Sequence, residues 1–185
     1  MKQKLKRYIK FLLGMDNSDY IERLKNKGLR VGKNFHIQQG CIIDESHSYH
    51  IVIGDDVSLA PNVHILAHDA STWWFLEYTK IKNTTIGSKV FIGAGSIIMP
   101  GVTIGNEVII GAGSVVTKNI EDGCVYAGNP AKFIMHTQDY IAREREQMHN
   151  GNTFGEEFSE ANNASLQNKE ILKQAAAKYG TAYLK

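Results

Sequence analysis

The chain has 185 residues, the size of a single domain, so one core with terminal extensions is expected rather than two catalytic domains. Its 21 Lys and Arg against 19 Asp and Glu give a net charge of +2, and 43% of its residues are apolar. This composition excludes a disordered chain and lacks the basic excess of a nucleic-acid-binding domain. The two cysteines, Cys41 and Cys124, are too few for a disulfide framework, which favours a reducing cytoplasmic location.

Residues 1–30 are predicted to form a helical cap. Segment 1–13 is basic, but its uninterrupted apolar run covers only residues 11–13, too short for a signal-peptide core. No stretch is long and apolar enough to cross a bilayer. Apolar residues at helical spacing over 5–12 predict an amphipathic helix. Two interpretations stay open: a cap that packs on its own protein, or a helix that binds a membrane surface weakly, close to a lipid-linked acceptor.

The strongest signal is an aliphatic residue at every sixth position. It recurs without a break at Ile86, Ile92, Ile98, Ile104, Ile110 and Val116. Four positions after each of the first five stands a small or β-branched residue, and a glycine often follows the aliphatic one. The pattern reappears upstream, around Ile53 and Ile65 and more loosely from Val31. Self-similarity at a fixed period is typical of a solenoid.

A period of six fits neither a helix nor a continuous strand, so each unit must be a short strand followed by a turn. Three units close one triangular coil in which the large aliphatic residue points to the axis. Coils stacked about 4.8 Å apart give three parallel sheets lined inside by Ile and Val. Glycine is expected where a corner needs an unusual backbone angle or a close approach. We therefore predict a mainly β protein, a parallel β-helix of about four to five triangular coils over 31–134, with flanking helices.

The repeat frame slips twice. The first slip is a gap of ten residues between core isoleucines, which predicts a bulge over 45–50. The second is a gap of 21 residues before Ile86, where the small inward position falls on Asp69. A charge cannot lie unpaired in an aliphatic column, so the chain is expected to leave the coil near His68. The resulting excursion over about 69–83 is a candidate for function, because long loops on rigid scaffolds usually carry it.

Helices are predicted on both sides of the coils. Asp19 and Glu22 resemble a capping box at the start of a short N-terminal helix. The C-terminal extension over 135–185 contains two segments with helical patterns and a polar linker between them. The two segments are Gln138–His149 and Leu166–Tyr179.

From residue 86 onward the sequence resembles the hexapeptide-repeat acyltransferases, most of all their maltose and galactoside O-acetyltransferase branch. The segments that carry the resemblance read IGSKVFIGAGS (86–96), PGVTIG (100–105), GAGSVVTK (111–118) and AGNPAK (127–132). The likeness covers roughly residues 31–134. It implies a left-handed parallel β-helix assembled as a homotrimer, with acetyl-CoA as the acyl donor between neighbouring subunits.

The resemblance also implies site residues. Its catalytic histidine stands where the chain leaves the coil, after a unit such as the APNV at 60–63, and this is His68. The repeat frame places the same residue at the root of the excursion. Main-chain N–H groups of small residues would bind the pantetheine amides, and two lysines the CoA phosphates. The implied acetyl-CoA contacts are Phe91, Ala94, Gly95, Ala112, Gly113, Thr117, Lys118, Asn129, Pro130 and Lys132.

The acceptor site departs from the family pattern. Asp69 stands where the sugar acetyltransferases have proline, and their acceptor-facing asparagine is not found beside Cys41, where Gln39 is among the nearest polar residues. The predicted acceptor contacts are Asp44, Gln39, Trp74 and Asp69. For Asp44 a turn-forming role is an equal alternative, and for Trp74 packing against an adjacent subunit.

Acyl transfer to a hydroxyl needs positioning, a base and donors for the developing oxyanion. A neutral His68 can take the hydroxyl proton and return it to the CoA thiolate. The N–H of Ala94 is the candidate oxyanion donor by resemblance, and a loop-anchoring role for His68 stays open. No metal site is predicted, because His64 and His68 lie on a strand and a loop root, where their spacing carries no helical meaning. His47 and His50, in the first bulge, are interpreted as solvent-facing turn residues, and a role as ligands or acceptor contacts is the alternative.

The sequence thus predicts a cytoplasmic, acetyl-CoA-dependent O-acetyltransferase that acts on a saccharide or polysaccharide precursor. Two alternatives remain: N-acetylation of an amino sugar or nucleotide sugar, and a non-catalytic β-helix scaffold. A scaffold would bind no CoA, and the segments 117–118 and 129–132 count against it.

Overall fold

The computed structural model describes residues 17–185, so the predicted amphipathic helix over 1–13 lies outside the described residues. The chain divides into two compact units, and the boundary along the sequence falls between residues 137 and 138. Within residues 17–185, no helix is long and apolar enough to span a membrane.

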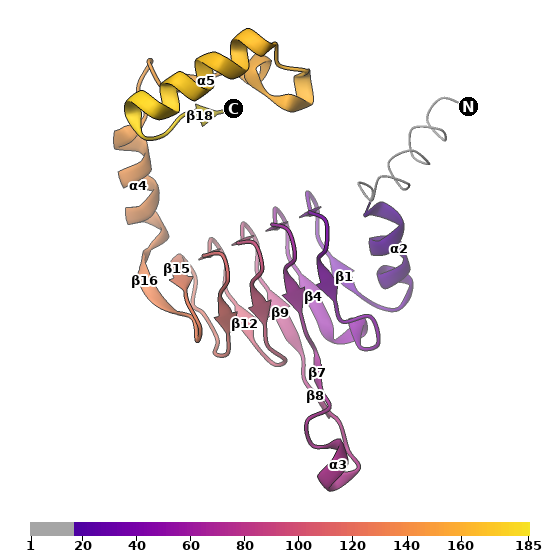
Figure 1. The fold of residues 1–185 in the computed structure, drawn as a ribbon. Helices are drawn as coiled ribbons and strands as arrows, with labels where there is room; N and C mark the ends of the chain where they lie inside the picture. Colours follow the sequence, from indigo (N-terminus) through magenta and orange to yellow (C-terminus); the bar gives the residue numbers. More distant parts are fainter. Residues whose placement is uncertain (1–16) are drawn as a thin grey trace, which may run out of the picture. The chain divides into compact units, whose positions relative to one another are not determined.

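Short strands of the first unit stack into three parallel sheets (Figure 1). The first sheet contains β1 (Arg30–Val31), β4 (Ile51–Ile53), β9 (Thr84–Ile86) and β12 (Thr103–Ile104). The second contains β2 (His36–Ile37), β5 (Ser58–Leu59), β10 (Phe91–Ile92), β13 (Ile109–Ile110) and β15 (Cys124–Ala127), on which β16 (Lys132–His136) pairs antiparallel. The third contains β3 (Ile42–Ile43), β6 (His64–Ile65), β11 (Ile97–Ile98) and β14 (Val115–Val116).

Successive strands alternate among the three sheets, so every three of them close one coil. The described residues form four complete coils and a partial fifth that contains β15. This arrangement confirms the predicted left-handed parallel β-helix. The registers align the repeated aliphatic residues, for example Ile43, Ile65, Ile98 and Val116 in the third sheet. These side chains are buried, each contributing about 1.5 to 3 kcal/mol, so the aliphatic column is the core.

Replacing a column residue is expected to cost far more stability than replacing its outward neighbour. Ile104 is buried between Ile86 and the bridge to Ile120, whereas the adjacent Thr103 side chain points outward. Ile104→Ala should lower the free energy of unfolding by about 2 to 5 kcal/mol, and Thr103→Ala by about 0.5 kcal/mol or less. Urea denaturation followed by circular dichroism measures both. Equal losses would contradict an inward-facing column.

Glycine meets two different needs at the corners. A Cβ at Gly87 would lie 2.6 Å from the carbonyl carbon of Gly105 on the next coil, so the close stacking of turns excludes a side chain. Gly95 instead has a φ of +69°, a left-handed conformation that glycine adopts without strain, and a Cβ there would meet nothing. Both expectations for the corner glycines are therefore met, at different positions.

The N-terminal end of the column is covered by α2 (Ser18–Asn26). Its apolar side chains Ile21 and Leu24 are buried in the core. The helix begins one residue before Asp19, so the predicted capping box does not form; Asn17 occupies the N-cap position. The Asn17 side chain makes no cap hydrogen bond and donates instead to the Ile37 carbonyl at 2.9 Å.

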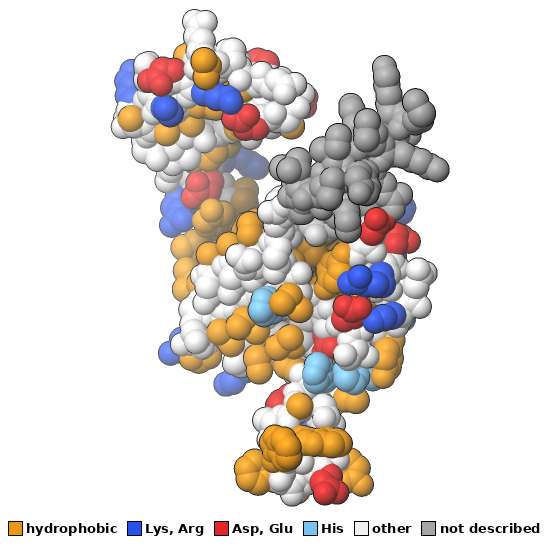
Figure 2. Space-filling model, turned by 45° about the vertical axis from the view of Figure 1, so that its right-hand side comes forward, with side chains coloured by type: hydrophobic (Ala, Val, Ile, Leu, Met, Phe, Trp, Pro, Cys, Tyr) orange, Lys and Arg blue, Asp and Glu red, His pale blue; other side chains and the backbone are white. Residues whose placement is uncertain are grey.

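Both frame slips are visible as departures from the coil. The first contains the 3-10 helix η1 (Ser48–His50). The second leaves the coil as an antiparallel ribbon of β7 (His68–Asp69) and β8 (Lys80–Ile81), with α3 (Trp73–Leu76) at its tip (Figure 1). Figure 2 shows hydrophobic side chains gathered at this tip and histidines close to its base. The excursion thus places an apolar tip away from the coils and His68 at its root.

The second unit is built on α4 (Thr137–Gln147) and α5 (Leu166–Tyr179). Between them lie β17 (Thr153–Phe154), η2 (Glu156–Phe158) and η3 (Glu160–Asn162), and β17 pairs with β18 (Tyr183–Leu184). The segment expected as a polar linker is therefore structured. Its anchor is the buried Asn152, whose side chain accepts from the His149 N–H and donates to the Gln147 carbonyl.

Candidate functional site

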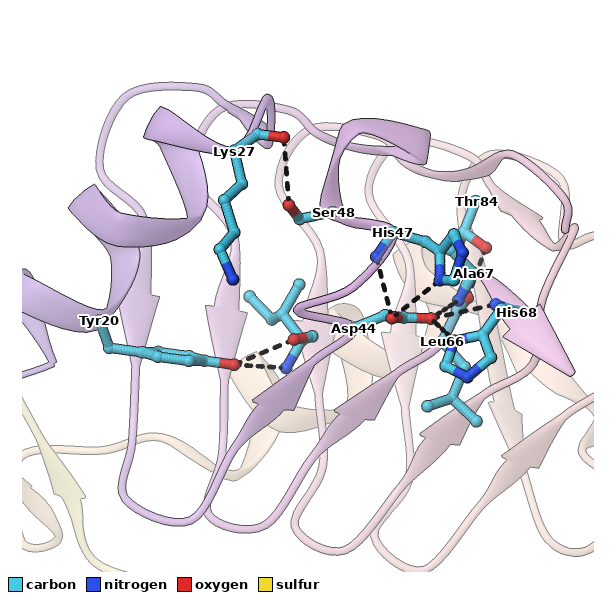
Figure 3. A network of polar contacts seen from close by, with 10 residues as sticks. Tyr20, Lys27, Asp44, His47, Ser48, Leu66, Ala67, His68 and Thr84 are labelled. Carbon is cyan, nitrogen blue, oxygen red and sulfur yellow. Dashed lines mark hydrogen bonds and ion pairs between the residues drawn. The ribbon is translucent and has the colours of Figure 1, made fainter. Parts of the chain in front are cut away.

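An aspartate and a histidine from adjacent coils meet at one corner of the β-helix. Asp44 directly follows β3, and His68 begins β7, three residues after β6. Because Ile43 pairs with Ile65, both chain segments leave the third sheet at the same corner. One carboxylate oxygen of Asp44, Oδ2, accepts the main-chain N–H groups of Ala67 and His68, each at 3.0 Å, and contacts Nδ1 of His68 (Figure 3).

The carboxylate fixes the tautomer of the imidazole. Burial of Asp44, which is only 4% exposed, would raise its pKa, but the hydrogen bonds from His68 and the Ala67 N–H outweigh burial and hold the pKa below its ordinary value. An ionised carboxylate only accepts, so Nδ1 of His68 is the donor and a neutral ring keeps its lone pair on Nε2. The His68 side chain is 35% exposed, so this corner can present a basic nitrogen to a bound molecule.

In the described chain the Asp44 carboxylate is occupied by protein contacts, so its predicted contact with an acceptor stays a prediction. Its side chain is buried, and besides the three contacts of Oδ2, the other oxygen accepts the His47 N–H at 3.2 Å. A carboxylate bonded in this way is placed to orient His68. The alternative role of Asp44 as a turn-forming residue accounts only for the hydrogen bond that it accepts from the His47 N–H.

His47 lies beside this pair, although the sequence favoured a solvent-facing turn residue over a site role for it. Its ring centroid lies 4.7 Å from that of His68, and its Nδ1 lies 3.7 Å from Oδ1 of Asp44. This nitrogen is buried and has no hydrogen-bond partner among the described residues. His50 of the same bulge is bonded through Nδ1 to Oδ1 of Asn83 at 2.6 Å, which ties the bulge to the end of the excursion. The ten-residue gap was the available signal, because it places the bulge beside the excursion root.

Two predicted acceptor residues lie on the excursion. The Asp69 carboxylate pairs with Lys80 across the ribbon and accepts the Ser71 N–H at 2.8 Å, and these contacts hold its pKa well below the ordinary range. Asp69 also lines a cavity of about 200 Å³ together with Thr117. Trp74 lies in α3 at the ribbon tip and is 90% exposed, so the described chain does not bring it to His68.

The predicted acetyl-CoA residues are divided between two corners of the β-helix. Thr117 and Lys118 follow β14, and the register of the third sheet places Thr117 in the same column as Asp44. The other corner holds the turns before β11 and β14 and the turn after β15. Those turns contain Ala94, Gly95, Ala112, Gly113, Asn129 and Pro130, all exposed. Phe91 on β10 and Lys132 at the start of β16 are also exposed.

Not every predicted main-chain donor is available. The N–H of Gly95 donates to the Pro61 carbonyl at 2.9 Å, and that of Gly113 donates to the Ala94 carbonyl at 2.8 Å. These bonds stack successive coils, so the two glycine N–H groups cannot bind pantetheine amides. The N–H groups of Ala94 and Ala112 donate no hydrogen bond within the part of the chain that the structure describes. The candidate donors are thereby reduced to the two alanines.

Gln39 does not lie at the His68 corner. It belongs to the turn between β2 and β3, on the other edge of the third sheet. There it lines a cavity of about 570 Å³ with Gly40, Pro61 and Asn62.

Comparison with known proteins gives a consistent picture. Residues 83–118 match a family model described as bacterial transferase hexapeptide (six repeats). The chain is 41% identical over 127 residues to protein CapG of Staphylococcus aureus, covering 64% of this chain and 72% of that protein. It is 38% identical over 117 residues to the galactoside O-acetyltransferase of Escherichia coli, covering 60% of this chain and 55% of that enzyme. The crystal structure of a maltose O-acetyltransferase from Clostridium difficile matches with a TM-score of 0.53 at 31% identity, covering 72% of this chain and 84% of that chain.

Proposed function

Because the chain belongs to the hexapeptide-repeat transferase family and is an acyltransferase, we propose that it transfers an acetyl group from acetyl-CoA to a hydroxyl of a saccharide or polysaccharide precursor. The observation that carries the proposal is the pairing of His68 with the buried Asp44. Relatives named for galactoside and maltose O-acetylation support a sugar hydroxyl as the acceptor.

In the proposed reaction His68 is the general base. Its Nε2 takes the proton of the acceptor hydroxyl as the hydroxyl oxygen forms a bond to the thioester carbonyl carbon. Asp44 stabilises the imidazolium that results, and the N–H of Ala94 is the proposed donor to the developing oxyanion. When the carbon–sulfur bond breaks, Nε2 returns the proton to the departing thiolate. A positioned base of this kind contributes about 10² to 10⁴ in rate.

We propose that the site is completed between subunits of a homotrimer. The predicted acetyl-CoA residues lie at two corners of one chain, so packing the third sheet of one subunit beside a neighbour would bring both sets to a shared groove. The outer face of that sheet presents the half-exposed Ile42, which favours such packing. Light scattering should give a mass of about 62 kDa, three times the 20.6 kDa chain. A monomer at catalytic concentrations would contradict the shared groove.

Lys118 is proposed to bind a phosphate of CoA. Lys118→Ala should raise KM for acetyl-CoA about 10-fold with little change in kcat, because a hydrogen bond to a charged group is worth about 1.5 to 3 kcal/mol. Lys33→Ala, at an exposed lysine of the first coil, is the matched control and should leave KM unchanged. Thiol release at varied acetyl-CoA measures both. An unchanged KM for Lys118→Ala would remove this lysine from the donor site.

An acceptor panel tests the proposed function. Saccharides, amino sugars and nucleotide sugars are each offered with acetyl-CoA, and thiol release and product mass are measured. O-acetylated saccharide is the expected product. Exclusive N-acetylation would replace the proposed acceptor class, and a chain that binds no CoA would be a scaffold. The cytoplasmic location, a role in polysaccharide biosynthesis and weak membrane-surface contact through residues 1–13 stay predictions.

A further inference from the structure

One contact at the His68 corner is left unused by the proposed mechanism. Oδ1 of Asp44 and Nδ1 of His47 face each other at 3.7 Å, too far apart for a hydrogen bond. This His47 nitrogen is buried and unpartnered within residues 17–185. A carboxylate oxygen and an unpartnered imidazole nitrogen that face one another in a buried place are suited to binding a cation between them.

The same corner offers three metal ligands. Asp44, His47 and His68 each provide one donor atom, and these atoms all lie within 4.8 Å of one another. A carboxylate and two imidazoles bind Zn²⁺ with bonds of about 2.0 to 2.2 Å, so tetrahedral geometry places donor atoms about 3.3 to 3.6 Å apart. The separation of 3.7 Å between Asp44 and His47 is close to that range. His68 contacts Asp44 directly, so its ring must move outward to admit an ion.

The three ligands come from segments held by the β-helix. Asp44 is fixed by main-chain donors, and His68 begins the ribbon at the coil edge. The His47 N–H is bonded to the same aspartate, and His50 fastens the bulge to Asn83. The main-chain positions of the three ligands are thus fixed before an ion binds, and the reorganisation needed is confined to side chains.

We propose that Asp44, His47 and His68 form a binding site, within one subunit, for a divalent transition ion such as Zn²⁺, and that the bound ion switches off the general base. The second half rests on the proposed function. Coordination at Nδ1 of His68 moves the ring proton to Nε2, and a protonated Nε2 cannot take the proton of an acceptor hydroxyl. The ion therefore inhibits without blocking the acetyl-CoA residues at the other corner.

Binding is tested on the full chain without substrates. After treatment with EDTA and its removal, the protein is titrated with Co²⁺, whose visible absorption reports four-coordinate geometry, and with Zn²⁺ by calorimetry. Wild type should bind one ion per chain. His47→Ala and His47→Gln should bind at least about 10-fold more weakly, since loss of even an outer-shell partner costs 10- to 100-fold. His36→Ala, which removes an exposed histidine from β2 in another sheet, should bind as wild type does.

The outcomes separate the two halves of the proposal. The metal site is overturned if wild type binds no ion, or if both folded His47 variants bind it as tightly as wild type does. The second arm measures turnover with and without Zn²⁺, each variant against its own metal-free rate. Inhibition that EDTA reverses in wild type, and that needs at least about 10-fold more Zn²⁺ in His47→Ala, supports the switch. Binding without inhibition overturns the switch alone, and an inactive metal-free enzyme overturns the proposed function instead.

Discussion

His68→Ala is expected to lower kcat about 10²- to 10⁴-fold while KM for acetyl-CoA stays within about twofold. The variant removes the nitrogen that takes the acceptor proton, but no residue in the predicted acetyl-CoA set. The structure supports this expectation because Asp44 accepts a hydrogen bond from Nδ1 of His68, which leaves Nε2 as the basic atom. Initial rates of thiol release, at saturating acceptor and varied acetyl-CoA, separate kcat from KM.

A matched control distinguishes this effect from general damage. His36→Ala removes an exposed histidine from β2, in a different sheet, and should leave both constants unchanged. Circular dichroism and light scattering check that each variant keeps its fold and assembly. Turnover of folded His68→Ala equal to wild type would reduce this histidine to a loop anchor, the alternative that the sequence left open.

The six-residue period was sufficient to predict the coil, its core and the excursion root. Each repeat encodes one inward position, so the pattern alone identifies the aliphatic residues that stack. It also locates His68, because a charge at the next inward position forces the chain out of the column. The same logic explains why the corner glycines were predicted correctly: stacking distance and backbone angle are local properties of the repeat.

The arrangement around His68 depends on pairing between coils, which the period does not encode. Ile43 pairs with Ile65, 22 residues on, because the first gap adds four residues to a coil of 18. This register places Asp44 beside the root of the excursion. His47 follows Asp44 by three residues, so it lies at the same corner. Aligning the core isoleucines of successive coils in the sequence would have predicted that Asp44 lies close to His68. The ring contact of His47 depends on how the bulge folds back, which no repeat specifies.

The second prediction concerns the residue that positions His68. Asp44→Asn keeps the size of the side chain, but an amide that donates to Nδ1 of His68 places the ring proton on Nε2. We therefore expect kcat to fall about 10²- to 10⁴-fold, as expected when a buried carboxylate no longer fixes the tautomer of a catalytic imidazole. KM for acetyl-CoA should change little in Asp44→Asn. Asp44→Glu keeps the charge but should also have a lower kcat than wild type, because its longer side chain displaces the His68 ring. Rates and KM are measured as for His68.

Asp44→Asn should also lower the free energy of unfolding, since hydrogen bonds to a charged group contribute about 1.5 to 3 kcal/mol. The folded pKa of Asp44 lies below its ordinary value, so the carboxylate stabilises the fold above the unfolded pKa and that contribution is lost as pH falls through the folded pKa. The stability difference between wild type and Asp44→Asn should therefore shrink in acid, which urea denaturation at several pH values measures. A folded Asp44→Asn with normal kcat would show that the pairing is structural only, because orientation of the base would then owe nothing to the charge.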